Sequence, residues 1–301
     1  MKEIREIIQA FDSRREEPFA LATLVRARGS SYRRPGARML IARDRSTVGA
    51  LSGGCLEKEV AARAQEVIAI GAPILLRFDT RLRYGCNGAI EILIEKLQPT
   101  LLAQLGAAQR ERRTSWMATI FENNDSLGSC FLAAPADAPA TAFVQMIPPP
   151  LQLVLIGEGP DSPPLRDLAK VLGWTVIEAE EAGALPDAID EWTAVVVKTH
   201  NYGRDYAALE KLLPLGLPYI ALLGPRRRRD QLLHTLLATD LTARSELFSP
   251  AGLDLGAESP EEIALAIVAE IQSVFARTQV ESLRARKRPI HPPGEPFAAP
   301  V

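Results

Sequence analysis

The chain has 301 residues, of which 47% are hydrophobic and 24% are charged, and its formal net charge is −2. This composition is typical of a soluble globular protein, and the length favours two domains. The net charge argues against nucleic-acid binding, which needs a strongly positive surface. No apolar run approaches the ~20 residues of a membrane span, and the charged, amphipathic N-terminus does not resemble a secretory signal. Three widely spaced cysteines indicate a reducing compartment, so we expect a cytoplasmic protein without a membrane or nucleic-acid partner.

The first half of the chain predicts a mixed α/β domain over residues 1–147. Apolar residues at helical or alternating spacing define its elements. Residues 89–97 alternate, which predicts a strand with Glu91 and Glu95 on a solvated face. An arginine-rich loop is expected over residues 26–35. Helices are predicted at 2–11, 56–70 and 101–113, and strands at 19–25, 37–42, 48–51, 74–78, 89–97, 115–122 and 129–132.

Three consecutive prolines at 148–150 mark a stiff linker, after which the pattern changes. Strands now alternate with helices, and the apolar strands read as buried on both faces. This alternation predicts a Rossmann-like, doubly wound parallel-sheet domain over residues 151–290. The expected strands are 151–156, 175–179, 194–197 and 219–223, and the expected helices are 165–172, 206–213, 226–237 and 261–275.

The stretch 26–59 concentrates the features that suit an anion. Five arginines lie between Arg26 and Arg38, a turn containing Gly53 and Gly54 comes later, and Cys55 follows at the start of a predicted helix. A strand that runs into a glycine turn and a helix presents free backbone N–H groups at the positive end of the helix dipole. A thiol in that position is partly ionised. The alternative is an ordinary strand–turn–helix with a buried cysteine.

A second turn of similar type contains Gly85, Cys86 and Asn87. Its cysteine lies 31 positions after Cys55. The two turns could meet in space, but the residues alone do not decide it.

A glycine loop after the first strand of the second half has the context of a dinucleotide fingerprint. Gly157 and Gly159 form the turn, Glu180 lies near the position of a ribose-binding acid, and His200 follows the strand at 194–197. Pro160 removes an N–H group, and two acidic residues flank it, which weakens the case for NAD(P). The alternatives are a loop that keeps the fold without the ligand and, for His200, a histidine satisfied within its loop.

Four arginines at 226–229 open another helix. Cations are unfavourable at this end of a helix unless an anion is near. A phosphate, an acidic partner surface or a solvated basic turn would each account for them. The sequence lacks zinc-site spacing, a Gly-x-Ser-x-Gly elbow and a P-loop, so nothing supports a hydrolase or kinase.

Taken together, the motifs resemble the XdhC/CoxI family, accessory factors for xanthine dehydrogenase and related molybdenum hydroxylases. The matching stretches are GSSYRRPGARML at 29–40, SGGCLE at 52–57, GCNG at 85–88, IEILIE at 90–95, KTH at 198–200, YIALLGPRRRR at 219–229 and GLDLG at 252–256.

The resemblance implies a chaperone, rather than an enzyme, that binds molybdenum cofactor (molybdopterin). It would protect the cofactor during sulfuration and insert it into a xanthine dehydrogenase-type hydroxylase. The implied partners are that apo-enzyme, a cysteine desulfurase and a second copy in a homodimer. Cys55 is the first site candidate, as a contact to molybdenum or sulfur. The further candidates are Gly53, Gly54, Gly85, Cys86, Asn87 and, as phosphate contacts by electrostatics, Arg33, Arg34 and Arg38.

Two other hypotheses remain from the residues themselves. The first is an NAD(P)-binding oxidoreductase that uses the glycine loop of the second domain. The second is a scaffold for enzyme assembly that docks through the arginines at 226–229.

Overall fold

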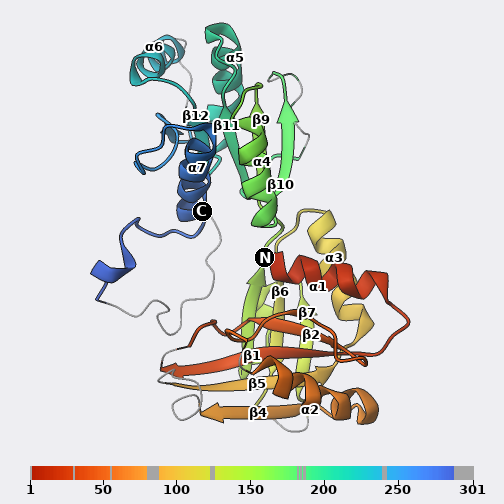
Figure 1. Cartoon of the computed structure of the whole chain (residues 1–301). Coiled ribbons are helices and arrows are strands. Elements are labelled where there is room, and N and C mark those ends of the chain that lie inside the picture. Colours follow the sequence, from red (N-terminus) through yellow and green to blue (C-terminus); the bar gives the residue numbers. More distant parts are fainter. Residues whose placement is uncertain are drawn as a thin grey trace. The chain divides into compact units, whose positions relative to one another are not determined.

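A computed structural model describes residues 2–29, 31–54, 56–79, 88–122, 126–181, 183, 185, 188–238 and 243–287. The chain forms two compact units (Figure 1). Unit 1 contains Met1–Pro149 together with the segment that begins at Ser282, and unit 2 extends from Pro150 to Glu281. Among the helices of the described residues, none is both long enough and apolar enough to cross a membrane.

Unit 1 is built on two antiparallel sheets. The larger sheet has the order β3-β2-β1-β5-β4, and the smaller has the order β7-β6-β8. The strands of the larger sheet are β1 (Phe19–Gly29), β2 (Arg38–Ala42), β3 (Thr47–Gly49), β4 (Ile74–Asp79) and β5 (Gly88–Lys96). Those of the smaller sheet are β6 (Ser115–Ile120), β7 (Gly128–Leu132) and β8 (Ala142–Ile147).

Alternation along β1 sends neighbouring side chains to opposite faces of the larger sheet, and each face has its own core. Ala20, Ala22 and Leu24 pack with α2 (Glu57–Ile70). Leu21 packs on the other face with α1 (Lys2–Ser13), α3 (Pro99–Arg110) and residues of the smaller sheet. The central strands of the larger sheet, β2, β1 and β5, are therefore largely buried on both faces.

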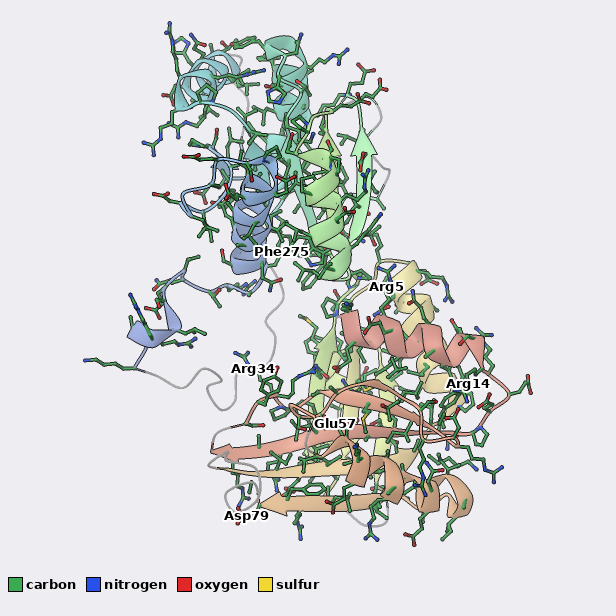
Figure 2. The ribbon with its side chains drawn as sticks, in the orientation of Figure 1. Arg5, Arg14, Arg34, Glu57, Asp79 and Phe275 are labelled. Atoms are coloured by element: carbon green, nitrogen blue, oxygen red, sulfur yellow. The ribbon has the colours of Figure 1, made fainter. Side chains whose placement is uncertain are left out.

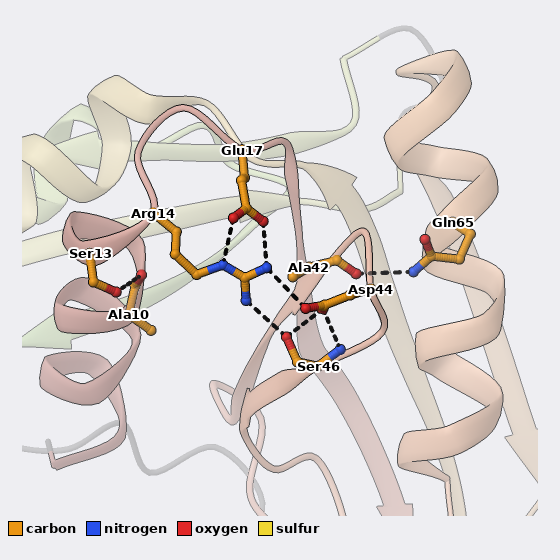
Figure 3. Close-up of polar contacts among 8 residues, drawn as sticks. All are labelled: Ala10, Ser13, Arg14, Glu17, Ala42, Asp44, Ser46 and Gln65. Atoms are coloured by element: carbon orange, nitrogen blue, oxygen red, sulfur yellow. Dashed lines mark hydrogen bonds and ion pairs between the residues drawn. The ribbon is translucent and has the colours of Figure 1, made fainter.

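A surface network fastens the turn between β2 and β3 to the segment after α1 (Figure 3). The Arg14 guanidinium donates to Glu17 (Nε to Oε1, 2.8 Å), Asp44 (Nη2 to Oδ2, 3.0 Å) and Ser46 (Nη1 to Oγ, 3.1 Å). From the other side, the Gln65 amide on α2 donates to the Ala42 carbonyl at 3.2 Å. The turn of this hairpin is thereby held from two sides.

Unit 2 contains a five-stranded parallel sheet with the order β10-β9-β11-β12-β13. Its strands are β9 (Gln152–Ile156), β10 (Thr175–Ala179), β11 (Thr193–Val197), β12 (Tyr219–Leu222) and β13 (Leu247–Phe248). Helices α5 (Tyr202–Leu212) and α6 (Arg226–Leu237) share a core with one face. Helices α4 (Ser162–Val171) and α7 (Pro260–Phe275) pack against each other. The prediction of a mixed α/β domain followed by a Rossmann-like parallel-sheet domain is confirmed.

The prediction was wrong about the arginine-rich loop and about Glu95. Strand β1 continues to Gly29, because Arg26 pairs across the sheet with Glu91 after a register shift. The loop is therefore shorter than expected at its start. Glu95 is only 7% exposed, since the smaller sheet covers that face of β5 and the Ser129 N–H of β7 donates to its carboxylate at 2.8 Å. Strands β8 and β13 were not predicted, and β13 has only two residues.

Candidate functional site

The turn between β3 and α2 exposes its two central glycines. Gly53 and Gly54 both face solvent. Gly54 has φ +104°, a conformation that L side chains rarely adopt, although among the described residues, its chain neighbours apart, no atom lies within 4 Å of the place where a Cβ would be. The turn therefore requires glycine at 54 for its backbone shape and leaves open space beside it. Cys55 itself lies outside the described residues.

The Glu57 carboxylate organises this turn from the first residue of α2, where Figure 2 labels it. Its Oε1 accepts the N–H groups of Leu51 (3.1 Å) and Ser52 (2.8 Å), and its Oε2 accepts the Ser52 hydroxyl (2.8 Å) and the Leu56 N–H (3.1 Å). Burial acts to raise the pKa of Glu57, but these hydrogen bonds, led by those from Ser52, hold it below its ordinary value. The carboxylate thus fixes the backbone on both sides of Cys55.

The arginine-rich loop lies against the same turn. The Tyr32 ring, in a residue 70% exposed, comes within 3.9 Å of the Cβ position of Gly53. Arg33 Nη2 donates to Glu3 Oε2 on α1 at 2.8 Å. Arg34 is exposed. The structure therefore brings Gly53, Gly54, Arg33 and Arg34 into one neighbourhood of unit 1.

Glu3 joins that loop to the strands beneath it, a role that its position in the opening helix did not indicate. Besides Arg33, its carboxylate accepts the backbone N–H groups of Arg38 (2.9 Å) and Ala50 (3.4 Å). Gly49 leaves room for this arrangement, since a Cβ there would lie 3.2 Å from Glu3 Cγ and 2.3 Å from the Arg38 carbonyl oxygen.

Arg38 differs from the other two arginines because it has no solvent exposure. Its Nη1 donates to the Gly36 carbonyl at 3.0 Å and to the Gln145 amide oxygen, and burial lowers its pKa to about 10. A guanidinium enclosed in this way is not presented to a ligand in solution, in contrast to the expectation from electrostatics alone. In the part of the chain that the structure describes, its Nε and Nη2 have no hydrogen-bond partner.

The second cysteine turn belongs to the segment that connects the end of β4 to the start of β5 in the larger sheet. Gly85, Cys86 and Asn87 lie outside the described residues. The strand β4 ends at Asp79, labelled in Figure 2, and β5 resumes at Gly88. Gly88 is paired with Gly29, the last residue before the arginine-rich loop. The sheet register therefore places the start of β5, where the second cysteine turn ends, beside the end of β1, where the arginine-rich loop begins.

In unit 2 the four nucleotide-site candidates all lie at the carboxyl end of the parallel strands. Gly157 follows β9 with φ +99°, and a Cβ there would lie 2.6 Å from Thr199 Cα. Gly159 continues the same turn. Glu180, after β10, is exposed, and so is His200, after β11, which has φ +53°. Open α/β sheets bind ligands at this edge.

Sequence reasoning assigned no role to Lys198, whose side chain is fully buried beside the glycine turn. It also grouped four arginines that the structure separates. Arg228 forms an ion pair with Asp205 (Nη2 to Oδ2, 2.5 Å), and Arg229 donates to the Ser249 carbonyl at 2.7 Å, whereas Arg226 and Arg227 are exposed. Half of the cluster therefore serves the fold of unit 2.

Within the described ranges, no group of three or more His, Cys, Asp or Glu residues could hold a metal ion. Cys130 on β7 is exposed, and partial burial of its thiol together with the nearby Glu95 carboxylate raises its pKa. It therefore lacks the features of a reactive thiol.

Comparisons with known proteins agree with the motifs. A model of the XdhC and CoxI family matches residues 13–79, and a model of the XdhC Rossmann domain matches residues 153–271. A probable xanthine dehydrogenase subunit of Bacillus subtilis (strain 168) is 30% identical over 88% of this chain and 96% of its own. The "Molybdenum cofactor insertion chaperone PaoD" of Escherichia coli (strain K12) is 25% identical over 87% of this chain and 85% of its own.

A solved structure extends the likeness to the whole fold. The crystal structure of a xanthine dehydrogenase from Bacillus halodurans superposes with a TM-score of 0.78 at 26% identity, covering 97% of this chain and 98% of that one. Similarity therefore spans both units rather than the generic parallel sheet alone. On this agreement of motifs, family models and relatives, the chain belongs to the XdhC and CoxI family.

Proposed function

We propose that this protein is an accessory factor for molybdenum hydroxylases that carries molybdenum cofactor as its cargo. It holds the cofactor while the terminal sulfur is installed and inserts it into a xanthine dehydrogenase-type apo-enzyme. Family membership and the similarity to the insertion chaperone PaoD support this proposal. In this proposal the protein is cytoplasmic, acts as a homodimer, and takes part in sulfuration with a cysteine desulfurase.

The observation that carries the proposal is the glycine turn before α2. Glu57 fixes its backbone, Gly53 and Gly54 expose it, and the arginine-rich loop adjoins it. The cargo is an anionic pterin with a phosphate and a dithiolene-bound metal. Arg33 and Arg34 suit the phosphate, and the glycines permit close approach of the backbone.

Cys55 is the residue that we propose to contact the metal or its sulfur, because in the sequence it follows Gly54 directly and precedes Leu56, the N-cap residue of α2. A thiol there gains from the positive end of the helix dipole. Gly85, Cys86 and Asn87 are proposed as a second wall of the site, on the argument that their turn emerges beside the arginine-rich loop.

The test is co-expression with a molybdopterin pathway, followed by metal analysis and measurement of the pterin as its oxidised fluorescent product. The wild type is expected to retain molybdenum and pterin together, near one per chain. Cys55→Ser is expected to lose most of the metal, whereas Cys130→Ser, the matched exposed thiol, is expected to keep it. A wild type without pterin overturns the proposal, and full retention by Cys55→Ser removes Cys55 from the site.

A further inference from the structure

The turn between β9 and α4 occupies the point where the strand order of unit 2 reverses, between β9 and β11. In dinucleotide-binding sheets this turn receives the pyrophosphate. The second glycine of the turn allows the pyrophosphate to come close, and the helix that follows supplies free N–H groups. Gly159 holds the second-glycine position here. Whether the turn can receive a pyrophosphate depends on these two features.

The first turn of α4 has no backbone N–H left for an anion among its described residues. The Ser162 N–H donates to the Gly159 carbonyl at 3.1 Å, and the Leu165 N–H donates to the Asp161 carbonyl at 3.1 Å. Between them stand Pro163 and Pro164, which have no N–H group. The helix dipole remains, but the first three residues of α4, Ser162 to Pro164, offer no free N–H group to an anion.

The space beside Gly159 is filled by side chains of the protein itself. A Cβ at Gly159 would lie 2.6 Å from Asp161 Oδ1 and 3.5 Å from Lys198 Nζ. The Asp161 carboxylate is 6% exposed, and the Lys198 side chain has no exposure. The place that a pyrophosphate oxygen would take near the second glycine is therefore held by a carboxylate, which carries the same charge.

Lys198 keeps that carboxylate in place. Its Nζ lies 3.5 Å from Asp161 Oδ2 and donates a hydrogen bond to Ser162 Oγ, so one ammonium group joins the residue that follows β11 to the start of α4. A buried charge is retained only with a partner of opposite charge, and here the Lys198 ammonium and the Asp161 carboxylate are each other's partner. An entering phosphate would have to displace Asp161 and expose the buried lysine.

We infer that the Asp161 carboxylate, held by Lys198, takes the place of a dinucleotide pyrophosphate and closes unit 2 to NAD(P). Asp161 is thus a specificity-determining residue of this Rossmann-like unit, and Lys198 is the residue that positions it. This inference is independent of cargo binding in unit 1, and it argues against the oxidoreductase hypothesis raised by the glycine loop.

The inference predicts that removing the carboxylate opens the turn. We would titrate NAD⁺ and, separately, inorganic pyrophosphate into the full-length protein by calorimetry. The wild type is expected to show no binding up to about 1 mM ligand. Asp161→Ala leaves the Lys198 ammonium without its carboxylate partner. This variant is expected to bind NAD⁺ and pyrophosphate with a Kd at least about tenfold below 1 mM. Asp167→Ala removes an exposed charge from the same helix and is expected to behave as the wild type.

Asp161→Ala combined with Lys198→Met is expected to lose the gained affinity, because the cation is gone. Circular dichroism and thermal unfolding confirm that each variant is folded, and Asp161→Asn replaces Asp161→Ala if the latter is not. The inference is overturned by NAD⁺ binding to the wild type well below 1 mM. It is equally overturned if the folded variants without the carboxylate gain no affinity for either ligand.

Discussion

Glu57 and Ser52 form a two-point contact across the glycine turn. The Ser52 N–H donates to Glu57 Oε1 and the Ser52 hydroxyl to Oε2, each at 2.8 Å. The carboxylate belongs to the first residue of α2 and reaches back over five positions to the residue that precedes the two glycines. The turn is therefore shaped before any ligand binds, and its rigidity can be tested separately from its chemistry.

Glu57→Ala is expected to lower the free energy of unfolding by about 2 kcal/mol, because several backbone N–H groups lose a charged acceptor. The hydrogen bonds from Ser52 favour the ionised Glu57 carboxylate in the folded protein and lower its pKa. The contribution of Glu57 to the free energy of unfolding is therefore fully present above the unfolded pKa of about 4.3. It is lost as pH falls through the lower pKa of the folded protein. Urea unfolding at a series of pH values between about 3 and 7 measures the difference in the free energy of unfolding between the wild type and this variant. Glu59→Ala, an exposed neighbour in the same helical turn, is the control, and an equal loss in both variants would contradict the role of Glu57.

Gly54→Ala is expected to destabilise the protein by about 1 to 3 kcal/mol, since φ +104° strains an L residue even where space is available. Gly53→Ala is the matched comparison, because its Cβ would only touch the Tyr32 ring at an ordinary 3.9 Å. Thermal unfolding and cofactor retention should separate the two variants. Similar effects from both would show that backbone conformation at 54 is not the constraint.

Glu95→Gln is expected to stabilise the protein at pH 7 by about 1 kcal/mol, since the buried Oε1 has no partner among the described residues. Burial raises the folded pKa of Glu95 above the unfolded value of about 4.3, so the unfolded chain releases the proton first. Wild-type stability therefore falls as pH rises through that interval. The advantage of the variant should vanish near pH 4. Glu91→Gln, which breaks the pair with Arg26, should show no such gain.

Lys198→Met is expected to cost about 3 to 5 kcal/mol, because it leaves the Asp161 carboxylate buried without its cation. The double variant with Asp161→Ala should cost less than the sum of the two single changes, which is the mark of direct coupling. Urea unfolding of the wild type, the two single variants and the double variant gives the four free energies of this double-mutant cycle. Lys170→Met, at an exposed position of α4, controls for loss of a lysine, and strict additivity would argue against the pair.

Much of the fold was predictable because the responsible signals are local. The helical spacing of Ile4, Ile7, Ile8 and Phe11 predicted α1, and the alternation of Ile90, Ile92 and Ile94 predicted β5. The repeated strand–helix pattern after the prolines predicted the parallel sheet. Two-residue β13 carries too few positions for any periodicity to appear.

The glycine turn before α2 and the glycine loop of unit 2 were likewise predicted from the sequence alone, because residue type at short spacing dictates their backbone. The arginine-rich loop was predicted too long at its start, because Arg26 pairs across the sheet with Glu91. The tertiary structure alone decided which charges meet. Arg38 and Gln145 lie 107 positions apart, and Lys198 and Ser162 lie 36 apart, so no local pattern could pair them. Burial of Glu95 depended on a second sheet that covers its strand, and the inferred closure of the unit 2 turn depended on Lys198, which follows another strand. Charge and glycine pattern specify where a site can form, whereas packing of distant strands decides whether it stays open.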